Sequence, residues 1–271
     1  MKKLLLVAIA IISSFGILSC QNNERDTLVV GLEAAYAPFN WTVLEGSSYD
    51  EAYPLSGTNQ YVDGYDVQIA KMIAEELDME LEIKAVEWDG LISSLTNTED
   101  IDLIIAGMSP TAARAETVLF TDEYYASTHV IVLRTDSAYA NATSINDFQG
   151  ANVVGQLSTI YDDVIEQMDG VNHADPLADV PTIITAINSG IYDATVLELP
   201  VAIAVIENNP DLTYIEFEPG QGFNVSYEDR VVSIALRQDQ QALAEQINAI
   251  LETISLEDRE ALMLDAIERQ P

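Results

Sequence analysis

The stretch Gly107–Tyr125, GMSPTAARAETVLFTDEYY, places one arginine in a loop of small residues. It follows Ile101–Ala106, a nearly continuous apolar run typical of a buried strand. Loops at the carboxyl edge of an α/β sheet are where such folds bind ligands. The guanidinium of Arg114 suits a carboxylate in bidentate geometry, and the Gly107 amide and the Ser109 hydroxyl can donate beside it. The alternative is an ordinary turn with a surface salt bridge, and the residue types alone favour neither.

The segments around this loop predict two successive α/β units. Strand patterns are found at 28–31, 80–85, 101–106, 129–133, 152–154, 194–197 and 231–236. Helical patterns are found at 66–77, 88–95, 159–168, 180–189, 200–207 and up to residue 254 from an N-cap at Asp239. Residues 42–63 are polar and indicate an irregular insertion. This order predicts an α/β fold of two lobes, each a mainly parallel sheet flanked by helices.

The N-terminus has the pattern of an export signal. Residues 1–19 carry a charged start and a short apolar run, which is too short to be a convincing transmembrane helix. The run ends in ILSC, which resembles a bacterial lipobox, so Cys20 is the expected site of acylation by fatty acids such as palmitate. Residues 20–26 would form a polar tether. We therefore expect a lipid-anchored protein outside the cytoplasmic membrane, at the cell surface or in the periplasm; a plain secreted protein is the alternative.

Composition limits the possible partners. The chain has 271 residues, 48% of them hydrophobic, which is ample for a packed core. Its net charge is −34, and loss of the two lysines of the leader makes it −36. Such a surface repels nucleic acid and anionic lipid, so contact with a membrane is expected only through the lipid anchor. Cys20 is the only cysteine, which excludes an internal disulfide.

Several segments, in the right order, resemble the amino-acid-binding branch of bacterial extracellular solute-binding proteins, the receptor subunits of ABC importers. They are Gly31–Phe39, Gly64–Lys71, Trp88–Leu95, Asp102–Tyr125, Asp147–Gly150, Tyr192–Pro200 and Val231–Leu236. The resemblance implies a two-lobed periplasmic-binding-protein clamp (type II), with 27–125 and 231–271 in lobe 1 and 126–230 in lobe 2. It also implies capture of a polar L-amino acid and delivery to an ABC permease, with no catalysis and no cofactor.

The resemblance implies roles at the charged ends of the ligand. Arg114 would hold the α-carboxylate, helped by Ser109 and Thr159. Glu198 stands where the family usually has aspartate, and it would bind the α-ammonium together with the Gly107 carbonyl. A zwitterion that leaves water needs a paired cation and anion, because its desolvation otherwise defeats binding.

Four further residues would contact the ligand side chain. By the same resemblance, Tyr36 and Trp88 would sandwich it, and Glu33 and Gln156 would contact its distal end. Arginine or lysine is the favoured ligand, and glutamine is next. As alternatives, Trp88 could be ordinary core and Glu33 a solvated surface acid. Phe39 is expected to pack the loop.

Two other functions remain open at this point. A dehydratase-like enzyme can be built on the same clamp, but His129 and His173 have neither nucleophile nor metal-ligand spacing. A sensory module normally carries a transmembrane helix and an output domain, and neither pattern is present. Two departures from the family bear on the site: Ser158 stands where glycine is common, and the 42–63 insertion could cap the cleft.

Overall fold

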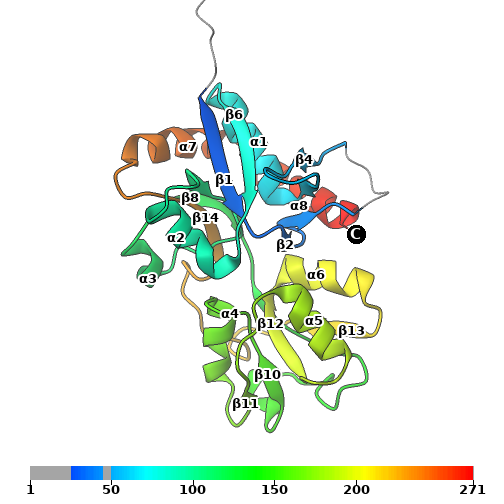
Figure 1. The fold of residues 1–271 in the computed structure, drawn as a ribbon. Helices are drawn as coiled ribbons and strands as arrows, with labels where there is room; N and C mark the ends of the chain where they lie inside the picture. Colours follow the sequence, from blue (N-terminus) through cyan, green and yellow to red (C-terminus); the bar gives the residue numbers. More distant parts are fainter. Residues whose placement is uncertain (1–25, 45–49, 271) are drawn as a thin grey trace, which may run out of the picture.

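The structure is a computed structural model that describes residues 26–44 and 50–270. The predicted signal and Cys20 lie outside the described residues. The chain forms two lobes, each built on a five-stranded sheet, and Figure 1 shows one lobe above the other. In the described ranges, no helix has the length and apolar character needed to cross a membrane.

The sheet of the first lobe combines early strands with one late strand. Its order is β6 (Glu80–Ala85), β1 (Thr27–Leu32), β7 (Leu103–Ile104), β14 (Val231–Leu236) and β8 (Leu119–Ala126). Strand β1 is parallel to β6 and β7, whereas β14 is antiparallel to β7 and β8. The helices of this lobe are α1 (Tyr65–Glu76), η1 (Trp88–Gly90), α2 (Leu91–Thr96), α3 (Ala112–Ala115), α7 (Gln241–Thr253) and α8 (Leu256–Arg269).

The sheet of the second lobe has the same arrangement of directions. Its order is β11 (Asn172–His173), β10 (Asn152–Val154), β12 (Ala194–Glu198), β9 (His129–Arg134) and β13 (Leu212–Ile215). Strand β10 is parallel to both neighbours, and β9 is antiparallel to both of its own. The helices are η2 (Ile145–Phe148), α4 (Ile160–Asp163), η3 (Val164–Gln167), α5 (Val180–Asn188) and α6 (Leu199–Asn208). In each sheet a single strand, β14 in the first lobe and β9 in the second, runs against the other four, so both sheets are mainly parallel in strand direction, as predicted.

Most predicted segments form the predicted elements, with a few differences. Part of 42–63 pairs into a small sheet of order β2 (Ala35–Tyr36), β3 (Asn40–Thr42), β5 (Tyr61–Asp63) and β4 (Tyr53–Pro54). The predicted strand 101–106 pairs only over β7, and the predicted helix 159–168 divides into α4 and η3. Helix α7 has its N-cap at Gln240 and not at Asp239, and no side chain caps it.

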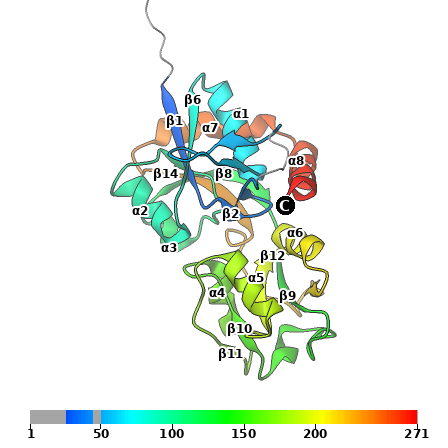
Figure 2. The same cartoon turned by 45° about the vertical axis from the view of Figure 1, so that its right-hand side comes forward.

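The C-terminal helix α8 was not predicted, and it contacts both lobes. Ser255 caps it by accepting a hydrogen bond from the Asp258 amide at 3.1 Å. Arg269 forms a bidentate ion pair with the buried Asp63, at 2.9 and 3.0 Å. Gln270 donates to the Ala204 carbonyl of α6 at 2.9 Å, and Figures 1 and 2 both show α8 beside α6.

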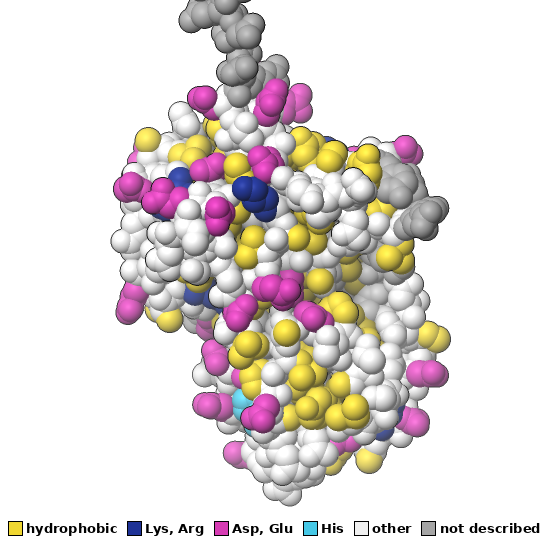
Figure 3. Space-filling model, in the orientation of Figure 1, with side chains coloured by type: hydrophobic (Ala, Val, Ile, Leu, Met, Phe, Trp, Pro, Cys, Tyr) yellow, Lys and Arg dark blue, Asp and Glu magenta, His cyan; other side chains and the backbone are white. Residues whose placement is uncertain are grey.

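The buried core is continuous between the lobes. One apolar cluster contains Tyr36 and Ile69 of the first lobe together with Val154 and Ile183 of the second. Helix α5 contacts β2 across the junction. The lobes are therefore closed on one another. On the face shown in Figure 3, acidic side chains are spread over both lobes and basic ones are few.

Candidate functional site

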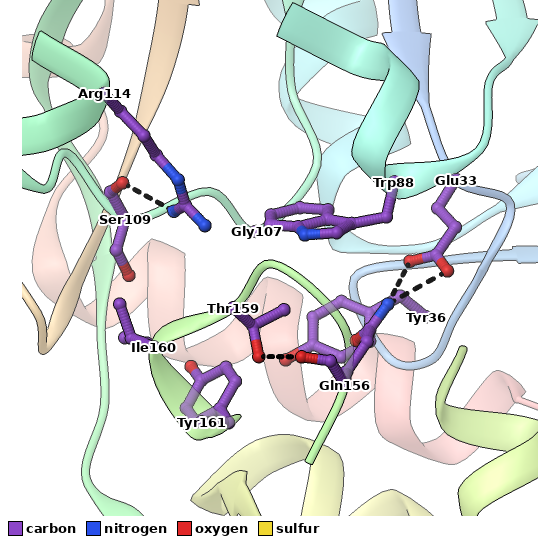
Figure 4. A pocket seen from close by; sticks show the side chains of 10 residues that line it. All are labelled: Glu33, Tyr36, Trp88, Gly107, Ser109, Arg114, Gln156, Thr159, Ile160 and Tyr161. Carbon is purple, nitrogen blue, oxygen red and sulfur yellow. Dashed lines mark hydrogen bonds between the residues drawn. The ribbon is translucent and has the colours of Figure 1, made fainter. Parts of the chain in front are cut away.

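A cavity lies where the two lobes meet. Its lining residues are Glu33, Tyr36, Trp88, Gly107, Ser109, Arg114, Gln156, Thr159, Ile160 and Tyr161. Its empty volume is about 280 Å³, including the part open to solvent. Figure 4 shows Arg114 at one end, Glu33 at the other and the Trp88 ring between them. All the residues that the sequence predicted as ligand contacts line this cavity except Glu198, which is hydrogen-bonded to Tyr36 beside it. Their roles as ligand contacts stay predictions.

Local capping positions the arginine. The Thr111 side chain accepts from the Arg114 amide and starts α3, so the guanidinium points back into the cavity. Its Nη1 donates to the Ser109 carbonyl at 2.9 Å, and its Nη2 donates to the Ser158 carbonyl of the other lobe at 3.1 Å. The guanidinium carbon lies 5.1 Å from the Trp88 ring centroid, in cation–π range. Burial lowers the pKa of Arg114, but a guanidinium remains charged in proteins.

Glu198 is a buried acid that faces two tyrosines. It ends β12 and is only 2% exposed, and its Oε1 accepts from the Tyr36 hydroxyl at 2.5 Å. Burial raises the pKa of Glu198 to about 8, although hydrogen bonds with Tyr36 and Tyr161 act in the opposite direction. No Lys or Arg among the described residues forms an ion pair with it. The position therefore suits a cationic group brought by a ligand.

Tyr161 is a site residue that sequence reasoning missed. It lines the cavity from α4 and is buried. Burial, and after it the contact with Glu198, raise the pKa of the Tyr161 hydroxyl well above its usual value. The available signal was its place in the first turn after the Thr159 cap. That signal is weak, because an aromatic residue on the apolar face of a helix more often packs into the hydrophobic core than lines a binding site.

Glu33 and Gln156 form a pair between the lobes. The Gln156 amide donates to both carboxylate oxygens of Glu33, at 3.2 and 3.4 Å, and to the Ala178 carbonyl at 3.2 Å. Burial raises the pKa of Glu33 to about 7, and the negative charges of Asp179 and Glu87 add to this effect. The alternative of a solvated surface acid therefore does not fit Glu33.

Backbone conformation shapes both sides of the cavity. Gly107 has φ of +59°, and an added Cβ would lie 3.0 Å from Tyr36 Cε1. Ser158 adopts the left-handed conformation that glycine favours, with φ of +60°, so the departure from glycine leaves the loop path possible at a cost in strain. Its carbonyl accepts from Arg114 and from Trp88 Nε1, the latter at 3.2 Å. Trp88 thus lines the cavity while it also packs against the apolar core of the first lobe.

The other residues singled out in the sequence differ in whether they could contact a ligand. The Thr159 hydroxyl donates to the Gln156 carbonyl at 2.7 Å and caps α4, so its proton is already committed. Phe39 is fully buried and stacks on Tyr36 with ring centroids 5.5 Å apart, which confirms its packing role. His129 and His173 do not line the cavity, and within the described part of the chain no group of three His, Cys, Asp or Glu side chains could hold a metal ion.

Comparison with known proteins identifies a family. Residues 28–263 match the family model of bacterial extracellular solute-binding proteins, family 3. The arginine-binding extracellular protein ArtP of Bacillus subtilis is 28% identical over 263 residues, which cover 93% of this chain and 92% of that protein. The L-cystine-binding protein TcyJ of Escherichia coli is 24% identical, over 83% of this chain and 76% of that protein. These relatives are binding proteins and not enzymes.

Solved structures of the same kind share the fold. An amino acid ABC transporter substrate-binding protein of Streptococcus pneumoniae, bound to L-arginine, has a TM-score of 0.75 and 26% identity, over 90% of this chain and 95% of that one. Truncated arginine-bound ArgBP of T. maritima has a TM-score of 0.70 and 32% identity, over 84% and 96%. An ancestral arginine-binding protein bound to glutamine has a TM-score of 0.70 and 26% identity, over 89% and 97%.

Proposed function

Since this chain belongs to the family-3 bacterial extracellular solute-binding proteins, we propose that it is the receptor of an amino-acid ABC importer whose cavity holds a polar L-amino acid. Arginine or lysine is favoured, and glutamine is next. The observation that carries the proposal is the charge arrangement at one cavity: one guanidinium, Arg114, the buried Glu198 and the partly buried Glu33, and neither acid has a basic partner among the described residues.

The backbone end of the ligand would lie between Arg114 and Glu198. The α-carboxylate would replace the Ser158 carbonyl on Nη2, in the bidentate geometry that a guanidinium prefers. The α-ammonium would take the place of the Tyr36 hydroxyl beside Glu198, within reach of the Gly107 carbonyl. Burial of a zwitterion is then offset at both ends, which is the condition for tight binding.

The ligand side chain would run toward Glu33. A cationic group there would satisfy a carboxylate that now accepts from the Gln156 amide. The Trp88 and Tyr36 rings offer apolar faces along the way. Similarity to arginine-binding proteins supports a basic ligand, and similarity to an ancestral arginine-binding protein with glutamine bound supports the runner-up. An acidic ligand would set a second carboxylate beside Glu33, which forms no ion pair with a Lys or Arg of the described residues.

Ligand capture would be coupled to lobe closure. Four residue pairs are hydrogen-bonded across the cavity between lobes: Tyr36–Glu198, Gln156–Glu33, and the Ser158 carbonyl with Trp88 and Arg114. All but the bond of Trp88 use an atom that the proposed ligand would contact. A ligand that bridges the same groups would favour the closed form by its differential contacts, and the permease would recognise that form.

Calorimetric titration with the twenty amino acids tests the proposal. Arg114→Ala should weaken binding by roughly 100-fold or more, since breaking a buried ion pair costs about 3–5 kcal/mol. Arg134→Ala is the control, because it makes the same change in net charge at a half-buried position outside the cavity lining, where Arg134 pairs with Asp136 and donates to the Ile187 carbonyl. If no amino acid binds wild type, or if Arg114→Ala binds within about threefold of it, the proposal fails.

We also propose that Cys20 carries a lipid anchor. The support is the lipobox-like ILSC sequence and the polar tether that follows. Cys20→Ser should move the protein from the membrane fraction to the soluble fraction and leave the ligand Kd unchanged, because stable anchoring needs two or more lipid signals. Wild-type protein that is soluble and has no added mass on its N-terminal peptide would contradict this.

A further inference from the structure

We propose that Asp66, which lies behind the cavity and outside its lining, is a positioning residue that holds the two ligand-contacting loops of the first lobe in place. The loops are 33–36 and 107–109, and the inference on affinity rests on the proposed amino-acid function. Asp66 is fully buried in the first turn of α1, where the helix dipole favours an acid. Among the described residues it has no Lys or Arg partner.

One oxygen of Asp66 reaches the 33–36 loop. Its Oδ2 accepts from Asn40 Nδ2 at 2.8 Å, and Asn40 Oδ1 accepts from the Ala34 amide at 2.7 Å. Ala34 has φ of +57°, a left-handed conformation that is strained for a residue with a Cβ. The two hydrogen bonds through Asn40, called the Asn40 relay below, therefore hold a strained residue directly beside Glu33. By fixing the backbone there, they set the directions in which the Glu33 and Tyr36 side chains point.

The other oxygen reaches the 107–109 loop. Its Oδ1 accepts from the Tyr124 hydroxyl at 2.7 Å, and that hydroxyl accepts from the Gly107 amide at 3.0 Å. Gly107 is likewise left-handed, with φ of +59°. A single carboxylate is thus connected, through one side chain on each side, to the amide of the left-handed residue in each loop.

The segment before Asp66 is built for this approach. Gly64 has φ of +135°, and a Cβ there would lie 2.2 Å from the Phe39 carbonyl oxygen, so only glycine allows this contact. The amides of Tyr65 and Asp66 donate to the carbonyls of Pro38 and Phe39, at 3.0 and 2.8 Å. The start of α1 is therefore fixed against the loop that the Asn40 relay orders.

An acid is required at position 66 because both side-chain oxygens accept. In Asp66→Asn, the new amino group would face either Asn40 Nδ2 or the Tyr124 hydroxyl, and one relay would lose its acceptor. Exchanging the two residue types, Asp66→Asn together with Asn40→Asp, allows every bond to be remade. The amide nitrogen introduced at position 66 would donate to the carboxylate introduced at position 40. That carboxylate would still accept from the Ala34 amide, and the amide oxygen at position 66 would still accept from Tyr124.

Hydrogen–deuterium exchange of the ligand-free protein is the direct test, because it does not depend on the ligand. Asp66→Asn should speed exchange in peptides covering 33–36 or 107–109 by about fivefold or more, as expected for the loss of one net hydrogen bond. The double exchange variant should return both to wild-type rates. Tyr124→Phe should speed exchange at Gly107 only. Unchanged exchange in folded Asp66→Asn and Tyr124→Phe would overturn the inference.

Affinity provides the second measurement. Asp66→Asn should raise the Kd of whichever amino acid wild type binds by about tenfold or more, and the double variant should return it to within about threefold. Asp63→Asn is the matched control. Asp63 is also buried; its Oδ2 accepts from Arg269 at 2.9 Å and its Oδ1 accepts from the Gly64 amide at 2.6 Å. The asparagine oxygen can still accept from Gly64, so only the ion pair with Arg269 is lost, which should lower Tm and leave Kd within about threefold. If Asp63→Asn and Asp66→Asn raise Kd equally, Asp66 is merely structural. If wild type binds no amino acid, the proposed function fails, and exchange still decides the role of Asp66.

Discussion

Replacing Glu33 by glutamine should change ligand preference without disturbing the site. The substitution keeps the shape of the side chain, and the new amide oxygen can still accept from Gln156 Nε2, which now donates at 3.2 Å. It removes one partly buried negative charge that lies near Asp179 and Glu87. Ligand-free Glu33→Gln should therefore melt at the wild-type temperature or slightly above it.

The expected size of the effect follows from the change of bond type. A hydrogen bond to a charged group contributes about 1.5–3 kcal/mol and a neutral one about 1 kcal/mol, so a basic ligand should lose about 0.5–2 kcal/mol, or roughly 2- to 30-fold in Kd. Burial raises the pKa of Glu33 to about 7. The carboxyl is therefore partly protonated at neutral pH, and the loss should be larger at about pH 8 than at about pH 6.

Calorimetric titration of arginine, lysine and glutamine into both proteins measures this change. Glutamine should bind Glu33→Gln within about threefold of wild type, since its amide needs no charge partner. Glu87→Gln is the control, because Glu87 is exposed, lies near Glu33 and gives the same change in net charge. Its effect should stay below about fivefold, as for exposed charges. Equal loss of arginine and glutamine affinity in Glu33→Gln would refute the reasoning, as would tight wild-type binding of aspartate, glutamate or leucine.

Two further results are expected. Burial raises the pKa of Glu33 to about 7 and of Glu198 to about 8, from 4.5. Protonation of these two carboxyls stabilises the folded protein fully below about pH 4.5, and this stabilisation is lost as the pH rises through the two folded-state pKa values. The Tm of the ligand-free protein should therefore fall between about pH 5.5 and 8.5, and a bound cationic amino acid should reduce that fall. A Tm that stays constant or rises over this range would contradict the reasoning. Gly107→Ala should lower both Tm and affinity by more than Gly57→Ala, because both positions have positive φ but only the first Cβ would meet Tyr36; equal effects in melts and titrations would show that backbone strain alone matters.

Short-range patterns were enough to predict most elements and most of the cavity. The apolar periods of α1, β6, α5 and β14 depend on neighbours within a few residues, so they are visible in the chain itself. The arginine loop and the family-like segments similarly indicated residues that the structure brings around one cavity. The same reasoning did not predict α8, whose position is set by packing against α1 and α6, which lie far away in the chain.

Tertiary packing decided the chemistry of the site. The sequence does not show which Asp or Glu side chains have unusual pKa values. Burial raises the pKa values of Glu33, Asp66 and Glu198 and so distinguishes them from the many solvated carboxylates of this chain. The same holds for Tyr161 of α4, which packs beside Glu198 of β12 within the second lobe and faces the junction where Tyr36 of the first lobe is hydrogen-bonded to the same carboxylate. Motif and periodicity specify which side chains are present and which segments they occupy. The desolvation and the long-range hydrogen bonds that give those side chains their properties arise only when distant segments pack together.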